Sequence, residues 1–173
     1  MKAQITVNGK SIEIEISRNQ AKELGLIDRE TTGYERVEVE ETYYLVEVDD
    51  EITNMKHNGQ LDRDCYDVGN YYSNKTIAEN NARADRLLRQ LRQWQALNDK
   101  PISEKDWNDE SKKKWFVAYS YGAEKLYADY YYIMRLPNTI HFATKEKAEE
   151  AIEVFRDELI WYFVEYQQRL DEE

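Results

Sequence analysis

One short pattern occurs twice in the chain and constrains the fold more than any other feature. Residues 72–79 and residues 142–149 both read aromatic, small, cap residue, Lys, two variable positions, Ala, Glu. Asn74 and Thr144 occupy the cap position, where a side-chain oxygen can accept a hydrogen bond from a backbone N–H that the first helical turn leaves free. The pattern therefore predicts two long helices, each entered from a strand.

Apolar residues after Thr144 recur at steps of three and four, which is typical of one face of an amphipathic helix. This face consists of Ala148, Ile152, Phe155, Leu159, Tyr162, Tyr166 and Leu170. A second stripe of Ala151, Val154, Trp161 and Val164 widens it. We expect a helix through residue 170 that contacts a sheet on one side and another helix, or a second subunit, on the other. The earlier helix is expected over residues 76–97.

Strands are predicted in front of each helix. The candidates are residues 34–39, 42–48, 52–55, 115–121 and 127–136, whereas residues 60–67 read as a loop. Residues 42–46 resemble residues 115–119, so the sequence predicts two strand–strand–helix units in tandem. The matching segments are short, and chance similarity between two strand-to-helix junctions is the alternative explanation.

The N-terminal segment reads as a hairpin followed by a short helix. Asn8-Gly9 stands between alternating apolar residues, which is a strong hairpin signal because both turn positions need positive φ. Ser17 and Gln20 form a capping pattern, and Gly25 is a natural end for the helix. The predicted fold class is α+β, with antiparallel strands and two long amphipathic helices. Its parts are 1–30 (hairpin and short helix), 31–100 (first unit) and 101–173 (second unit), and the two units form one compact domain.

The sequence predicts a cytoplasmic protein that does not enter a membrane. No apolar run approaches the about 20 residues of a membrane span. Met1-Lys2 leads directly into alternating strand residues, so no signal peptide is expected. Cys65 is the single cysteine, which excludes an internal disulfide and favours a reducing compartment.

The formal net charge of −11 is unevenly distributed. Residues 1–70 hold 16 acids and 8 bases (−8), residues 71–114 hold 7 and 10 (+3), and residues 115–173 hold 12 and 6 (−6). This excess argues against nucleic acid as a general ligand, because phosphate binding needs a basic face. It suits a basic protein partner, unless the charge serves only solubility. The candidate partner-binding residues are Glu38, Glu40, Glu41, Glu47, Asp49, Asp50 and Trp107.

Two of these interpretations have named alternatives. Trp107, among polar residues, either contacts a partner or pins its own loop. The helix over residues 76–97 carries a basic arc of Arg83, Arg86, Arg89 and Arg92. This arc is either a solvated face that pairs with acids of the other unit or a site for an acidic partner or nucleic acid.

No motif in the sequence predicts catalysis, a metal or a cofactor. Phosphate loops, dinucleotide fingerprints and zinc spacings do not occur. His57 and His141 lie outside metal-ligand patterns, and Cys65 has no local activating partner. Asp62, Asp64 and Asp67 could hold a hard cation, but they lack the Gly and the terminal Glu of a calcium loop, which favours a solvated or strand-capping role. We therefore expect a protein that is not an enzyme and uses no cofactor.

The layout of the whole chain resembles small uncharacterised accessory proteins of phages and prophages of Gram-positive bacteria. The resemblance is carried by the Asn-Gly opening, by residues 32–36, 69–72 and 87–91, by the loop at 106–108 and by the two Lys-x-x-Ala-Glu helix starts. It implies a protein made in the cytoplasm of an infected cell, and no functional residue transfers from it.

The resulting functional hypothesis is a phage protein that binds and inhibits a host defence protein, such as a CRISPR nuclease, through an acidic, Tyr-rich surface. Tyrosine contributes 14 residues, and it is enriched in binding surfaces. One alternative is a virion or assembly component that forms a homo-oligomer through the apolar helix faces. Another is a nucleic-acid-associated regulator that uses the basic helix face.

Overall fold

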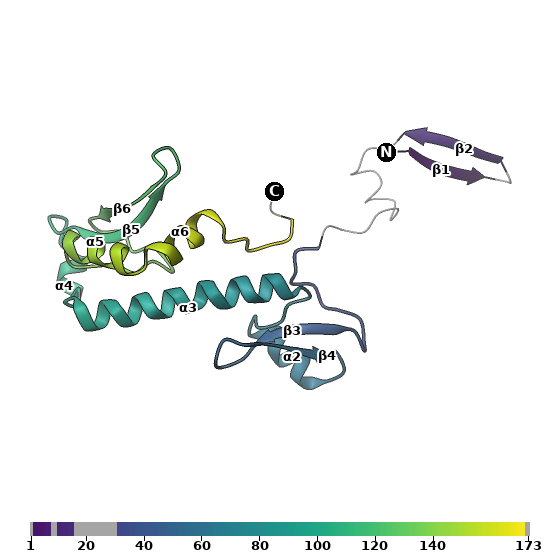
Figure 1. Cartoon of the computed structure of the whole chain (residues 1–173), viewed down its shortest axis with the longest axis horizontal. Coiled ribbons are helices and arrows are strands. Elements are labelled where there is room, and N and C mark those ends of the chain that lie inside the picture. Colours follow the sequence, from purple (N-terminus) through teal and green to yellow (C-terminus); the bar gives the residue numbers. More distant parts are fainter. Residues whose placement is uncertain (1, 8–9, 16–30, 172–173) are drawn as a thin grey trace.

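The computed structural model describes residues 2–7, 10–15 and 31–171, and its fold is α+β, as predicted (Figure 1). The described residues form three two-stranded antiparallel sheets. The first pairs β1 (Lys2–Val7) with β2 (Lys10–Glu15), and its register places Ile5 opposite Ile12. The predicted Asn8-Gly9 turn and the predicted helix from Ser17 lie outside the described residues.

The first unit contains a hairpin of β3 (Thr42–Val46) and β4 (Ile52–Lys56), then α2 (Gln60–Asp67) and α3 (Lys75–Asn98). Two predictions are wrong in this unit. Residues 34–39 form an irregular segment and not a strand, and residues 60–67 form α2 and not a loop. The helix expected at 76–97 is confirmed as α3.

The second unit contains the same kinds of element in a different order. The short helix α4 (Glu104–Trp107) precedes the hairpin of β5 (Lys114–Ser120) and β6 (Lys125–Tyr131). The strand predicted to continue to residue 136 ends at Tyr131. Two helices follow, α5 (Lys145–Val154) and α6 (Arg156–Val164).

The repeated sequence pattern has the same geometry in both units. In the first unit the N–H of Tyr44 donates to the carbonyl of Tyr72 at 2.8 Å, and in the second the N–H of Trp115 donates to that of Phe142 at 3.0 Å. The helix caps follow two residues later, with Asn74 and Thr144 accepting N–H bonds from the first turn. Because Tyr44 is the counterpart of Trp115, the matching strands are offset by two residues from the predicted alignment, which placed residue 42 on 115.

The helix predicted to run from Thr144 to residue 170 is broken at Phe155 and ends at Val164. Phe155 has φ −112° and ψ 20°, outside helical values. On either side of the break, α5 contacts β5, β6 and α3, and α6 contacts α3 and β6. Residues beyond α6 cross to the first unit, where the N–H of Leu170 donates to the carbonyl of Thr32 at 3.0 Å.

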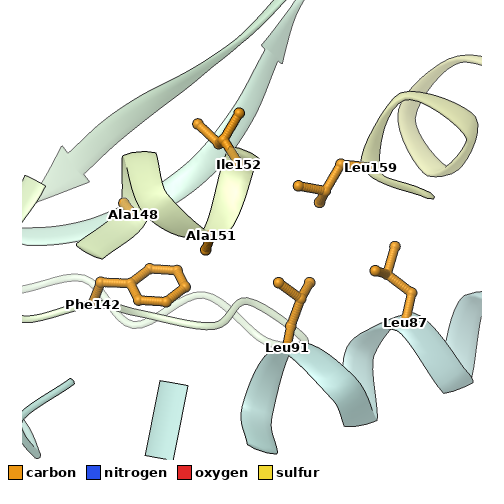
Figure 2. Packing of buried hydrophobic residues seen from close by; sticks show 7 residues of the cluster. All are labelled: Leu87, Leu91, Phe142, Ala148, Ala151, Ile152 and Leu159. Atoms are coloured by element: carbon orange, nitrogen blue, oxygen red, sulfur yellow. The ribbon is translucent and has the colours of Figure 1, made fainter. Parts of the chain in front are cut away.

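The helix α3 is shared by both units. Figure 1 shows the β3–β4 hairpin beside its N-terminal end and α5 and α6 along the rest. Near its start, Ile77 and Ala78 pack with Tyr72 in a buried cluster. Further along, Leu87 and Leu91 face α5, α6 and Phe142 (Figure 2). One helix therefore contributes to the cores of both hairpin–helix units.

Candidate protein-binding surface

The predicted acidic residues lie at the two ends of β3. Glu38, Glu40 and Glu41 are exposed in the turn that leads into the strand. This turn is ordered by hydrogen bonds, because the N–H of Glu40 donates to the carbonyl of His57 at 2.9 Å and the N–H of Glu38 donates to the Glu41 carboxylate at 3.0 Å. The first acidic group is thus held in place by its own backbone.

The second acidic group occupies the turn between β3 and β4. Glu47 and Asp49 are exposed, whereas Asp50 is half-buried and forms an ion pair with Arg89 on α3. Asp49 also accepts the N–H of Glu51 at 3.2 Å. The strand between the two groups spans roughly 20 Å, at about 3.3 Å per residue. The structure therefore separates the six predicted acids into two groups of three.

Five of the six carboxylates have no cationic partner. Among the described residues no lysine or arginine lies within ion-pair distance of Glu38, Glu40, Glu41, Glu47 or Asp49. The surrounding segment is acidic as a whole, since residues 31–74 contain eleven acids and three bases, a net charge of −8. Within the described part of the chain, no ion pair thus neutralises these five carboxylates.

Each acidic group contains an exposed valine that the sequence interpretation did not single out. Val39 stands between Glu38 and Glu40 with 69% of its surface exposed, and Val48 between Glu47 and Asp49 is fully exposed. The neighbouring α2 adds Leu61, Tyr66 and Val68 to the exposed apolar residues. The available signal for this exposed apolar area was a single valine within each run of acidic residues. Val39 and Val48 stand at the ends of two predicted strands (residues 34–39 and 42–48), but both valines lie in turns.

A buried polar network supports this surface from below. Asp62 is 3% exposed, and its carboxylate accepts the Tyr43 hydroxyl at 2.8 Å and the N–H of Asn58 at 2.6 Å. The N–H of Gly59 also donates to it, and this bond is the main reason why the pKa of Asp62 is below its usual range. The Tyr43 ring stacks on Tyr71 at 4.2 Å. These contacts fix α2 against the hairpin.

The three aspartates considered as cation ligands have separate partners. Asp62 bonds within the network just described, Asp64 accepts the Gln60 amide at 2.9 Å, and Asp67 lies 3.8 Å from Arg36. Within residues 2–7, 10–15 and 31–171, no group of three or more His, Cys, Asp or Glu could hold a metal ion. Asp62 instead caps the start of α2, whereas the sequence favoured a solvated or strand-capping role.

The four arginines of α3 point to different environments. Arg83 donates to both carboxylate oxygens of Glu158 on α6, at 2.9 and 3.0 Å, and its guanidinium lies 4.0 Å above the Trp161 ring. The pair also lowers the pKa of Glu158. Arg89 pairs with Asp50. Arg86 and Arg92 are exposed and have no carboxylate partner in the described chain. The helix therefore presents no continuous basic face, and two of its arginines join elements of the fold.

Trp107 lies at the opposite end of α3 from the acidic groups and is half-buried. Its ring meets that of His141 edge-on at 5.1 Å. This contact pins α4 against the segment before α5, as the alternative interpretation of Trp107 expected. The structure does not bring Trp107 together with the acidic groups.

The remaining reactive groups show no catalytic arrangement. Burial raises the pKa of the Cys65 thiol, which leaves it protonated and a poor nucleophile at neutral pH. His57 lies beside the Tyr43–Tyr71 stack, while His141 is buried in the second unit. The two histidines thus belong to separate local networks.

Comparison with known proteins adds no relative. No protein-family model matches the chain, and neither the curated proteins nor the solved structures searched contain a similar one. Among the described helices, none is both long and apolar enough to span a membrane. The resemblance to phage accessory proteins stays a prediction.

Proposed function

We propose that this protein binds a basic partner protein through the two ends of its β3–β4 hairpin. The observation that carries the proposal is the pairing of unneutralised carboxylates with an exposed valine in each acidic turn. In the phage setting that the resemblance implies, the partner is a host defence protein that handles nucleic acid, and binding inhibits it. No step of this function requires catalysis.

The chemistry of the surface supports a protein partner. Carboxylates that lack internal partners attract a positively charged surface from a distance and speed the encounter. Val39 and Val48 then offer apolar area that is removed from water on contact, which carboxylates alone do not supply. A partner with a basic channel flanked by apolar residues would satisfy both requirements.

The internal use of the arginines favours this function over nucleic-acid binding. Arg83 and Arg89 are engaged by Glu158 and Asp50, so the basic arc on which that alternative rests is interrupted. The second apolar stripe proposed for a homo-oligomer is half occupied within the chain, since Ala151 and Trp161 are buried whereas Val154 and Val164 stay exposed.

A capture experiment with charge-reversed variants tests the proposal. The tagged protein is incubated with lysates of Gram-positive strains that carry defined defence systems, and bound proteins are identified by mass spectrometry at low and high salt. One variant replaces Glu38, Glu40 and Glu41 with Lys, and a second replaces Glu47 and Asp49. The matched control changes the exposed Glu110, Glu124 and Glu165 to Lys, which gives the charge change of the first variant outside the surface. Glu110 and Glu124 alone, changed to Lys, match the second variant.

We expect one basic partner that is released by salt and lost with either surface variant, but retained by the control. Cells that express the protein should then allow phage to form plaques on the strain carrying that partner's defence system, and cells with the surface variants should not. Capture that is equally strong in the surface variants and the control would refute the proposed surface.

A further inference from the structure

A cavity lined by basic residues lies at the C-terminal end of α3, away from the acidic surface. Its volume is about 340 Å³, within the size range of small-molecule sites. Arg92 and Gln95 reach it from the last turns of α3, Trp107 from α4, and Arg135 and His141 from the segment between β6 and α5. Residues 101–102 and 139–140 complete the wall. Two regions distant in sequence, residues 92–107 and 135–141, therefore converge on one hollow.

The two guanidinium groups in this cavity lack carboxylate partners. Among the described residues no Asp or Glu lies within ion-pair distance of Arg92 or Arg135. Arg83 and Arg89, by contrast, each pair with a carboxylate. Arg135 lies over the Trp107 ring at 5.4 Å. Arg135 also lines a neighbouring hollow together with Glu104, but Glu104 does not line this cavity. Two like charges that share a cavity repel each other, and a bound anion would relieve that repulsion.

His141 forms a fixed and uncharged part of the wall. It is 8% exposed, and its Nδ1 lies 3.1 Å from the carbonyl of Thr139, so Nδ1 carries the proton that this carbonyl accepts. Burial, together with the positive charge of Arg135, lowers the pKa of His141, which keeps the ring neutral at pH 7. The Trp107 ring packs against it. The floor of the cavity is thus preformed, and the arginines supply its charge.

We propose that this cavity binds a small phosphate-bearing molecule, with the phosphate held between Arg92 and Arg135. Guanidinium groups match phosphate oxygens with paired hydrogen bonds, and two of them from separate elements can engage different oxygens of one phosphate. The Gln95 amide adds a neutral donor, and the Trp107 ring offers an apolar surface for a planar group attached to the phosphate. This site is independent of the acidic surface, because α3, about 36 Å long at 1.5 Å per residue, runs between the two.

Calorimetric titration of the full chain with inorganic phosphate and with adenosine monophosphate tests the inference at low salt. We expect both probes to bind, the nucleotide more tightly, and Arg92→Gln or Arg135→Gln to weaken each by about tenfold or more, since loss of one charge-assisted bond costs at least the free energy of one decade in affinity. The matched control is Arg86→Gln, which removes an exposed arginine of the same helix that does not line the cavity and should leave both affinities unchanged.

A single-stranded oligonucleotide distinguishes a built site from a charged surface. If the cavity recognises a small phosphate ester, the oligonucleotide should bind no better than the mononucleotide, and its binding should depend on Arg92 and Arg135 alone. The inference is overturned if neither phosphate nor the mononucleotide binds. It is also overturned if Arg86→Gln weakens binding as much as Arg92→Gln does. Circular dichroism of each variant confirms that the fold is retained.

Discussion

At the scale of single residues, Gly33 is a position where both the backbone conformation and the available space require glycine. Its φ is +96°, and a Cβ at this position would lie 2.7 Å from Cγ1 of Ile77. Its carbonyl accepts the N–H of Ser73 at 2.8 Å, beside the start of α3. We predict that Gly33→Ala lowers the free energy of unfolding by about 2–4 kcal/mol, because backbone strain and an overfilled core each cost about 1–3 kcal/mol. Urea denaturation followed by circular dichroism measures the loss.

Gly69→Ala provides the matched control. Gly69 also has a positive φ, +76°, but no atom lies within 4 Å of the position that a Cβ would take. Only the backbone cost of about 1–2 kcal/mol applies there. Equal losses in the two variants would mean that the close approach to Ile77 contributes nothing to the requirement for glycine at position 33.

At the scale of elements, the Arg83–Glu158 pair joins α3 to α6. The guanidinium makes two hydrogen bonds with the carboxylate and lies over Trp161, so it combines an ion pair with a cation–π contact. We predict that Arg83→Gln costs about 1–2 kcal/mol of stability, since both groups are part-exposed and each contact contributes about 0.5–1 kcal/mol. A double-mutant cycle with Glu158→Gln, measured by urea denaturation, isolates the coupling between the two side chains.

The control for this pair is Lys75 with Glu79, an exposed pair within α3 at 3.0 Å. Pairs of this kind contribute about 0.3–0.5 kcal/mol. If the Arg83–Glu158 cycle shows no more coupling than the Lys75–Glu79 cycle, then packing of apolar residues alone holds α6 against α3.

The elements that could be predicted from the sequence are those determined by neighbouring residues. Asn74 and Thr144 cap the helices that their spacing predicted, because a cap acts within one turn. The helix α2 was missed because it lacks an apolar run. It is held by Asp62, whose carboxylate binds the backbone at its start and the Tyr43 hydroxyl from β3. A contact across 19 residues leaves no periodic signal in the sequence.

The break at Phe155 has a similar explanation. The apolar spacing through Phe155 is regular, and no proline or glycine marks the site. The contacts on both sides of the break are tertiary, since α5 packs on β5, β6 and α3, and α6 packs on α3 and β6, so neighbouring residues give no signal for it. The candidate site likewise combines features that the sequence shows with features that only tertiary contacts determine. The acidic residues were identified by composition, whereas their division into two groups and the convergence of Arg92 with Arg135 follow from tertiary structure.

At the scale of the whole molecule, the sharing of α3 has a consequence for unfolding. Its first turns are in the core of the first unit and its later turns are in the core of the second. A substitution that weakens packing at one end of α3 should therefore destabilise the core at the other end as well. The reason is that unfolding of the helix in one core also removes it from the other core. We predict that Leu87→Ala, at a side chain only 1% exposed, costs about 2–5 kcal/mol and destabilises both units together.

Native-state hydrogen exchange measures this directly. In the Leu87→Ala variant, the most protected amides of β3 and β4 should lose as much protection as those of β5 and β6, although Leu87 packs in the second unit. Leu97→Ala, on the same helix but 77% exposed, is the control and should change neither set. Faster exchange confined to β5 and β6 would mean that the first unit unfolds separately. The acidic surface would then be carried by an independent module and not by the cooperative fold of both units.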